Sequence, residues 1–176
     1  MNSERKINKI VVFCAMLIIT AVGIALCAPL GPTIVDVAIE INSDGDFAGQ
    51  FDTLIAAVLA ADPIVFDTLN GNGQFTVFAP TDDAFQMIDI NSVNIGDLNQ
   101  QFLTDVLLYH VSRGRQYAKP ILRKKRIRML KGGFLLQNGG VLTDNLGREA
   151  DITVKDVEAA NGIIHAINRV VLPAAP

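Results

Sequence analysis

The feature that most limits the fold of this chain is a change in the period of its apolar residues. In the first half they recur at i, i+3, i+4, i+7 and i+8, as in the run Phe51, Leu54, Ile55, Val58 and Leu59. After residue 126 apolar and polar residues alternate instead, and turn signals such as Asn138-Gly139-Gly140 and Asn161-Gly162 interrupt the alternation. Helical spacing followed by short alternating segments is typical of helices followed by antiparallel hairpins. The chain is therefore predicted to be an α+β protein.

The helical half contains one predicted strand, residues 75–79, which is dense in β-branched and aromatic residues and ends at Pro80. Asp62 and Pro63 are the residue types of an N-cap and a first helical position, so a short helix is predicted to begin there. A later apolar stripe predicts a further helix from about Asp97 to Leu108.

The predicted junction after Pro80 places one hydroxyl and two carboxylates side by side, on Thr81, Asp82 and Asp83. Capping accounts for all three residues, because a threonine oxygen accepts from a backbone N–H and carboxylates in a first turn complement the helix dipole. A calcium site needs more oxygen ligands, and the nearest imitation of a calcium loop, residues 42–46, lacks the downstream glutamate. We therefore expect a structural junction, with no metal and no cofactor.

Residues 1–27 have the pattern of an export segment. Basic residues precede an apolar run from Ile10 to Leu26, and the small residues Ala25 and Cys27 suit cleavage after Cys27. An uncleaved membrane anchor and bacterial lipidation are the alternatives. All three export the rest of the chain, so we expect a protein that is secreted or anchored at the outer face of the cell membrane or cell wall.

The remaining chain divides into a Pro/Gly linker, residues 28–33, and one folded domain, residues 34–174. Both cysteines, Cys14 and Cys27, precede this domain. The domain is therefore expected to have no disulfide, no thiol nucleophile and no thiolate metal ligand.

Charge is unevenly distributed along the chain. No Lys or Arg occurs between Ile10 and Ser112, whereas the same stretch holds twelve Asp and Glu. Nine of the fifteen Lys and Arg then fall in residues 113–131. The small net charge of −3 therefore combines an acidic half with one basic segment.

The densest part of the basic segment is "RKKRIRMLK", residues 123–131. If it forms a strand, one face carries Arg123, Lys125, Ile127 and Met129, and the other carries Lys124, Arg126, Arg128 and Leu130. Three bases on one face cannot be buried without partners, so that face is solvent-exposed or binds a ligand.

Two interpretations of this run stay open. It is either an edge strand protected from pairing by its charges, or part of a site, formed by the basic segment 113–131, for an anionic polymer, a lipid headgroup or an acidic protein surface. Nucleic acid is not an expected partner of an exported protein, and no aromatic residues interleave the bases. The candidate binding residues in the run are Arg123, Lys124, Lys125, Arg126 and Arg128.

Three segments resemble the signature blocks of fasciclin-like (FAS1) domains. "FTVFAPTDDAF", residues 75–85, resembles the first block, "LLYHV", residues 107–111, the central Tyr-His motif, and "NGIIHAINRVVLP", residues 161–173, the closing block. The resemblance covers about residues 33–174. It implies a wedge of two β-sheets with helices packed against it, in an extracellular module for cell adhesion or matrix interaction. The implied partner is an extracellular or cell-surface protein or a polysaccharide.

The same resemblance makes Tyr109 and His110 candidate partner-binding residues, because this region is implicated in receptor binding in animal relatives. Core packing is the alternative for both. Two features depart from the family pattern: Asn168 stands where the family commonly has Asp, and residues 117–131 are unusually basic.

Catalysis is the third functional alternative, with His110 paired to Ser112 or Asp105 in a secreted hydrolase. His110 and His165 are the only histidines, and no Gly-x-Ser-x-Gly elbow is present to expose a serine. We therefore predict a non-enzymatic interaction domain.

Overall fold

A computed structural model describes residues 29–45 and 47–173. The predicted export segment and both cysteines lie outside the described residues. The helices are α1 Ile34–Ser43, α2 Asp52–Ala60, α3 Pro63–Asn70, α4 Asp82–Gln86, the 3-10 helix η1 Ile95–Asp97, α5 Gln100–Tyr109 and α6 Ala118–Ile121. The strands are β1 Phe75–Pro80, β2 Val111–Arg113, β3 Arg126–Arg128, β4 Phe134–Asn138, β5 Val141–Thr143, β6 Glu149–Ala159 and β7 Gly162–Ile167.

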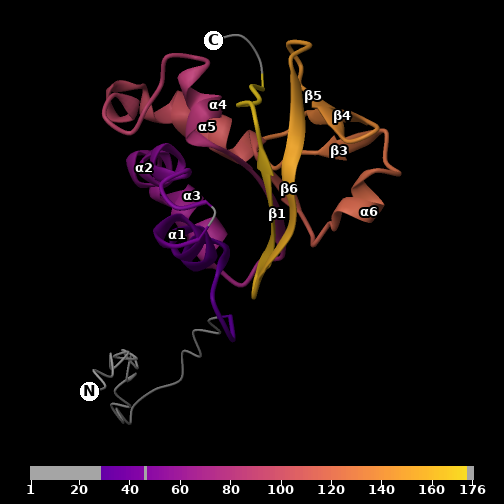
Figure 1. Cartoon of the computed structure of the whole chain (residues 1–176), viewed down its shortest axis with the longest axis horizontal. Coiled ribbons are helices and arrows are strands. Elements are labelled where there is room, and N and C mark those ends of the chain that lie inside the picture. Colours follow the sequence, from indigo (N-terminus) through magenta and orange to yellow (C-terminus); the bar gives the residue numbers. More distant parts are fainter. Residues whose placement is uncertain (1–28, 46, 174–176) are drawn as a thin grey trace, which may run out of the picture.

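The described strands form one sheet in the order β2-β1-β7-β6-β5-β4-β3, with helices α1 to α5 on one side (Figure 1). The α+β class is confirmed, but the strands form one seven-stranded sheet where a wedge of two sheets was expected. Strand β6 is the reason, because it is 11 residues long and pairs with β5 near its start and with β7 further along. Register shifts between Ile152 and Val157 mark where the β6 and β7 pairing is irregular.

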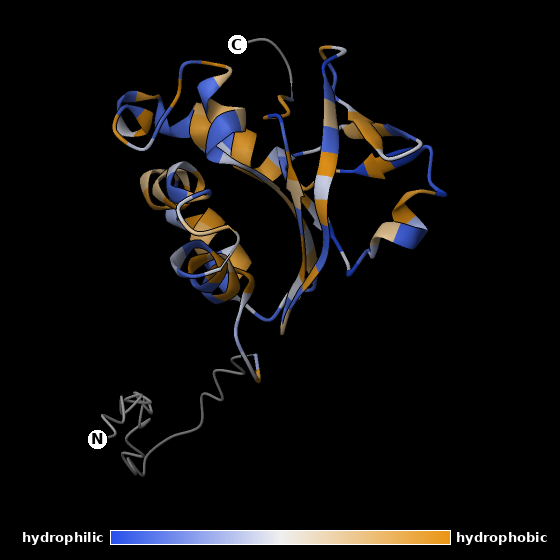
Figure 2. Cartoon of the chain, in the orientation of Figure 1, coloured by the Kyte–Doolittle hydropathy of each residue, from blue (hydrophilic) through white to orange (hydrophobic). Residues whose placement is uncertain are grey.

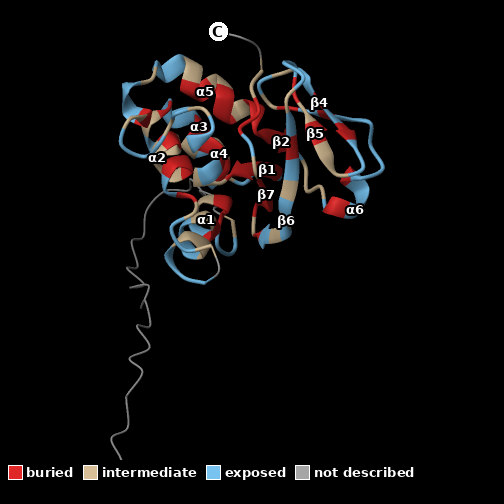
Figure 3. Ribbon diagram, turned by 45° about the horizontal axis from the view of Figure 1, so that its top comes forward, coloured by how far each residue is buried: buried red, intermediate tan, exposed pale blue. Residues whose placement is uncertain are grey.

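The predicted hairpins are confirmed, since β3 to β7 follow one another as antiparallel neighbours. The pairing of β1 with β7 is parallel and was not predicted. Both strands are buried along their whole length (Figure 3). Burial on both faces explains why apolar and polar residues do not alternate in the sequence of either strand.

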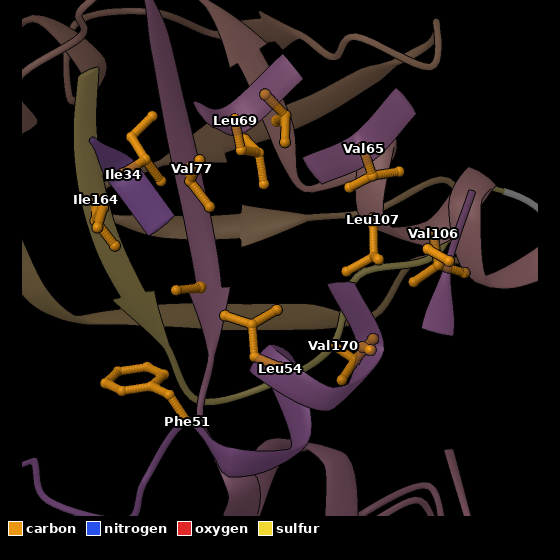
Figure 4. Close-up of a cluster of buried hydrophobic side chains, with 14 of the residues drawn as sticks. Ile34, Phe51, Leu54, Val65, Leu69, Val77, Val106, Leu107, Ile164 and Val170 are labelled. Carbon is orange, nitrogen blue, oxygen red and sulfur yellow. The ribbon is translucent and has the colours of Figure 1, made fainter. Parts of the chain in front are cut away.

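Two apolar clusters hold the described chain together, and Figure 2 shows apolar residues on both the helices and the central strands. The larger cluster joins α1, α2, α3 and α5 to β1 and β7, with Ile34, Leu54, Val77, Leu107 and Ile164 among its members (Figure 4). The smaller cluster contains Phe78 and Tyr109 together with Ile127, Leu135 and Leu142 from β3, β4 and β5.

The helix boundaries follow local capping chemistry. Helix α3 begins at Pro63 as predicted, with the Asp62 carboxylate accepting from the Ile64 N–H at 2.9 Å. Helix α5 begins later than predicted, because the Asn99 side chain accepts from the Phe102 N–H at 3.1 Å. In α2 the expected apolar stripe is only partly buried, since Leu59 is 71% exposed.

In the described part of the chain, no helix combines the length and the apolar character needed to cross a membrane.

Candidate functional site

The two end strands of the sheet, β2 and β3, meet each other. Ser112 and Met129 form an isolated antiparallel bridge, and the Leu130 N–H donates to the Val111 carbonyl at 2.6 Å. The Ser112 hydroxyl also donates to the Arg128 carbonyl at 2.8 Å. These contacts bring the sheet close to a closed barrel. They also place the residues of β2 next to those that follow β3 in the chain.

A cleft of about 550 Å³ lies beside this meeting point. Its lining contains four basic residues and no acidic residue: Arg113, Lys124, Arg126 and Arg128. Among the described residues, Lys and Arg form two ion pairs with carboxylates, Lys131–Asp105 and Arg148–Asp144. None of the four bases of the cleft takes part in either pair. The cleft is therefore a region of concentrated, uncompensated positive charge.

Strand β3 directs its bases into the cleft because successive side chains of a strand point to opposite faces. Ile127 and Met129 are 1% and 2% exposed and pack in the core, while Arg126 and Arg128 point outward. This confirms the predicted outward direction of Arg126 and Arg128, while Lys124 and Leu130 of the same predicted face lie outside the strand. The strand is shorter than the sequence suggested, because it begins at Arg126.

Two of the candidate binding residues in the run, Arg123 and Lys125, differ from the expectation. They lie between α6 and β3 and are exposed, so they do not share the buried face of Ile127 and Met129. Neither lines the cleft.

A short hydrogen-bond chain connects Lys124, in the segment before β3, to Ser112 of β2. The Lys124 ammonium donates to the Gln116 side-chain oxygen at 2.6 Å, and the Gln116 amide donates to the Ser112 hydroxyl at 2.8 Å. The guanidinium of Arg126 lies 5.1 Å from the ring centroid of Phe134, within cation–π range. Gln116 and Phe134 were not singled out from the sequence. Phe134 lies opposite Arg128 in the β3–β4 pair. The contact between β2 and β3 brings Arg113, the first residue of the basic segment, beside the bases of β3.

Tyr109 and His110 do not lie at the surface, being 0% and 2% exposed. The Tyr109 hydroxyl donates to the Phe134 carbonyl at 2.8 Å, and burial raises the pKa of Tyr109 to about 12. The prediction that these two side chains contact a partner directly is therefore not supported, and the alternative of core packing describes their positions.

The hydrogen bonds of His110 fix it as a neutral ring. Its Nε2 accepts from the Val171 N–H at 3.1 Å, so the proton sits on Nδ1, which donates to the Val106 carbonyl at 2.8 Å. Burial lowers the pKa of His110 to about 4. Both nitrogens are occupied by backbone groups, and no hydrogen bond links His110 to Ser112 among the described residues.

His165 is held in the same way. Its Nδ1 accepts from the Asp156 N–H at 3.2 Å, and its Nε2 therefore donates to the Gln116 carbonyl at 2.9 Å. Burial lowers the pKa of this histidine too. Neither histidine has a free nitrogen for proton transfer, so the geometry does not favour the hydrolase alternative.

The Thr81 junction differs from the sequence-based interpretation. Thr81 occupies the N-cap position of α4, but its side chain makes no capping hydrogen bond. Asp82 instead accepts from the Thr53 N–H at 2.9 Å and so caps the neighbouring helix α2. The junction therefore has a structural role, which it performs through the contact between Asp82 and the start of α2.

Asn168, one of the two departures from the family pattern, has a local explanation. Its side-chain oxygen accepts from the Asp151 N–H at 2.8 Å, and its amide donates to the Asp151 carboxylate at 3.1 Å. An aspartate could make the first bond but would repel the Asp151 carboxylate at the second.

Within residues 29–45 and 47–173, no group of three or more His, Cys, Asp or Glu side chains is placed to hold a metal ion.

Comparison with known proteins identifies the family. The fasciclin domain model matches residues 49–173, and the chain therefore belongs to the fasciclin domain family. Fold comparison agrees: a FAS1 domain pair from the insect cell adhesion molecule Fasciclin I superposes with a TM-score of 0.60 at 18% identity, over 80% of this chain and 51% of that chain.

The relatives include bacterial and animal proteins. Protein sll1483 of Synechocystis is 38% identical over 128 residues, covering 70% of this chain and 67% of the relative. Pig transforming growth factor-beta-induced protein ig-h3 is 33% identical over 150 residues, covering 85% of this chain and 20% of the relative. The cell surface glycolipoprotein MPB83 of Mycobacterium bovis is 29% identical over 133 residues, covering 76% of this chain and 59% of the relative.

Proposed function

We propose that this chain is a non-enzymatic domain that mediates adhesion or binding at the cell surface or in the extracellular matrix. The observation that carries the proposal is the contrast between its buried and exposed polar groups. Both histidines are buried with their nitrogens bound to the backbone, whereas the bases of the β2–β3 cleft are open and have no carboxylate partner among the residues that the structure describes. Such a surface is suited to binding and not to turnover.

The location is part of the same proposal. The export pattern of residues 1–27 supports a position outside the cytoplasm, either secreted or anchored. Two similarities give further support, since one relative is named as a cell surface glycolipoprotein and one structural neighbour as a cell adhesion molecule.

Attachment of cells tests this function directly. Surfaces coated with the full chain should retain cells of the source organism above the level of albumin-coated surfaces, and heat-unfolded chain should lose the effect. Attachment no greater than on albumin, with the chain shown to be folded by its far-UV circular dichroism, would contradict the proposal.

A further inference from the structure

We propose that the cleft between β2 and β3 binds an acidic polysaccharide, a chain of sugars that carries sulfate or carboxylate groups. This inference rests on the proposed interaction function and names its ligand class. Arg113, Lys124, Arg126 and Arg128 would contact the anionic groups.

The charge of the cleft sets the class of ligand. Its four bases come from two segments of the chain, and the lining holds no carboxylate. One isolated carboxylate or phosphate cannot contact all four bases. A ligand with negative charges repeated along its length can, and each contact with a base adds to the attraction.

The shape of the cleft favours a polymer chain over a bilayer. A hollow of about 550 Å³ lies within the usual range of about 300–1,000 Å³ for ligand pockets. Its bases line this hollow and do not form a flat array, whereas a bilayer presents its headgroups in a plane. A single extended chain of sugars can enter the hollow and place successive anionic groups beside β2 and β3.

Two of the four bases, Lys124 and Arg126, are also held in place before any ligand binds. Lys124 is bound to Gln116, which is bound in turn to Ser112 of β2, and Arg126 packs over Phe134. The Gln116 backbone is anchored in the core through its carbonyl, which accepts from His165. Less side-chain freedom is therefore lost on binding than for bases on an unconstrained surface.

The basic segment supplies a matched control. Lys119, Arg123 and Lys125 are exposed, belong to the same segment and lie outside the cleft lining. Replacing these three with Gln changes the net charge by the same amount as replacing Lys124, Arg126 and Arg128 with Gln. Any difference in binding between the two triple variants therefore depends on where the charges lie and not on the total charge.

Binding of the full chain is measured to immobilised dextran sulfate, with neutral dextran as the uncharged form of the same polymer. At about 0.05 M salt the cleft variant K124Q/R126Q/R128Q should bind dextran sulfate about tenfold more weakly than the unmodified chain, and the control variant K119Q/R123Q/K125Q should lose less than about threefold. Binding should be nearly abolished for all three proteins at about 0.5 M salt, where the screening length is roughly 4 Å. Equal losses in the two triple variants would overturn the cleft site.

A second variant tests whether weaker binding could result from loss of folding. Gln116→Glu keeps all four bases and nearly the same side-chain size, but it places a negative charge in the cleft. It should also weaken dextran sulfate binding, while its unfolding transition stays within the range of the control variant. Binding equal to that of the unmodified chain would count against the cleft.

Two further probes decide between ligand classes. Polyglutamate represents an acidic polypeptide, and vesicles of phosphatidylserine in phosphatidylcholine represent an anionic membrane. The residues before 29 affect all variants equally, so only the difference between the cleft and control variants is read. If this difference is larger for polyglutamate or for the vesicles than for dextran sulfate, the polysaccharide assignment is wrong.

The cell-attachment assay separates this inference from the proposed function. Attachment that survives in the cleft variant would leave the interaction function standing and refute the cleft as its site. Failure of the unmodified chain to attach cells, with cleft-dependent binding of dextran sulfate, would refute the adhesion function alone.

Discussion

Asp82 serves a different helix from the one that follows it in the sequence. Its carboxylate accepts from the Thr53 N–H at the start of α2, and its own N–H donates to the Gln50 carbonyl at 2.8 Å. Helix α2 has no side-chain cap of its own, because its N-cap residue is Phe51. The residue types at the junction indicated capping, but the sequence could not show which helix is capped.

Replacing Asp82 with Ala should lower the free energy of unfolding by about 1–2 kcal/mol, because an N-terminal N–H of α2 loses its acceptor. Thr81→Ala should cost less than about 0.5 kcal/mol, since the hydroxyl caps nothing. Urea denaturation of both variants measures the two values. The exposed Asp83→Ala is the control and should resemble Thr81→Ala. A greater cost for Thr81→Ala than for Asp82→Ala would show that the threonine is the cap.

At the scale of elements, the parallel pairing of β1 with β7 depends on one glycine. Gly162 begins β7 opposite Phe75 of β1. A Cβ at Gly162 would lie 2.3 Å from the Phe75 carbonyl oxygen and 2.5 Å from the Ile34 side chain. The Asn161-Gly162 pair was interpreted as a hairpin signal, and it does join β6 to β7. The structure adds that this glycine allows α1 and β1 to approach the same turn.

Asn161 has a comparable double role. Its buried side chain donates to the Leu69 and Gly71 carbonyls at 2.7 and 2.8 Å and accepts from the Ile34 N–H at 2.7 Å. One turn residue therefore links the end of α3 to the start of α1, which the local turn pattern could not predict.

Gly162→Ala should destabilise the chain by about 1–3 kcal/mol, because the added methyl group meets backbone that cannot move without disturbing β1. Gly96→Ala is the matched control, since a Cβ there meets no atom within 4 Å. Thermal unfolding followed by circular dichroism compares the two. Similar melting temperatures for the two variants would mean that β1 and β7 tolerate separation at this point.

At the scale of the whole molecule, two buried neutral histidines link stability to pH. The pKa of His110 is lowered to about 4 and that of His165 is also lowered, mainly by burial in both cases. Near His110, Arg148 lowers the pKa further and Asp144 raises it. In the unfolded chain both rings titrate near the usual histidine pKa of about 6.5. Between these values the unfolded state binds protons that the folded state excludes, so acid favours unfolding.

The free energy of unfolding should therefore be greatest above pH 6.5 and should fall as the pH drops toward 4. His110 alone should contribute a loss of about 3 kcal/mol over this range. Urea denaturation at intervals between pH 7.5 and pH 4.5 measures the slope. His110→Gln should be less stable at neutral pH but should show a shallower slope. An unchanged slope in this variant would assign the pH dependence to other groups.

The sequence by itself determined the class of fold, the family and most of the secondary structure, because these depend on local chemistry. The apolar period, the Asp62-Pro63 start of α3 and the Asn-Gly turns each act within a few residues. It also determined that Arg126 and Arg128 point away from Ile127 and Met129, since successive residues of a strand point to opposite faces.

Only the tertiary structure decided where the candidate site lies. The sheet is continuous because β6 pairs along both of its halves, and its two end strands meet at Ser112 and Met129. That meeting joins Arg113 to the bases of β3 and turns a charged run into a cleft. The burial of Tyr109 and His110 was decided at the same level, because Tyr109 packs in one cluster with residues of β3 and β4, and the Val171 N–H bonds to the His110 ring. Contacts of this kind join residues far apart in the chain, and no local pattern encodes them.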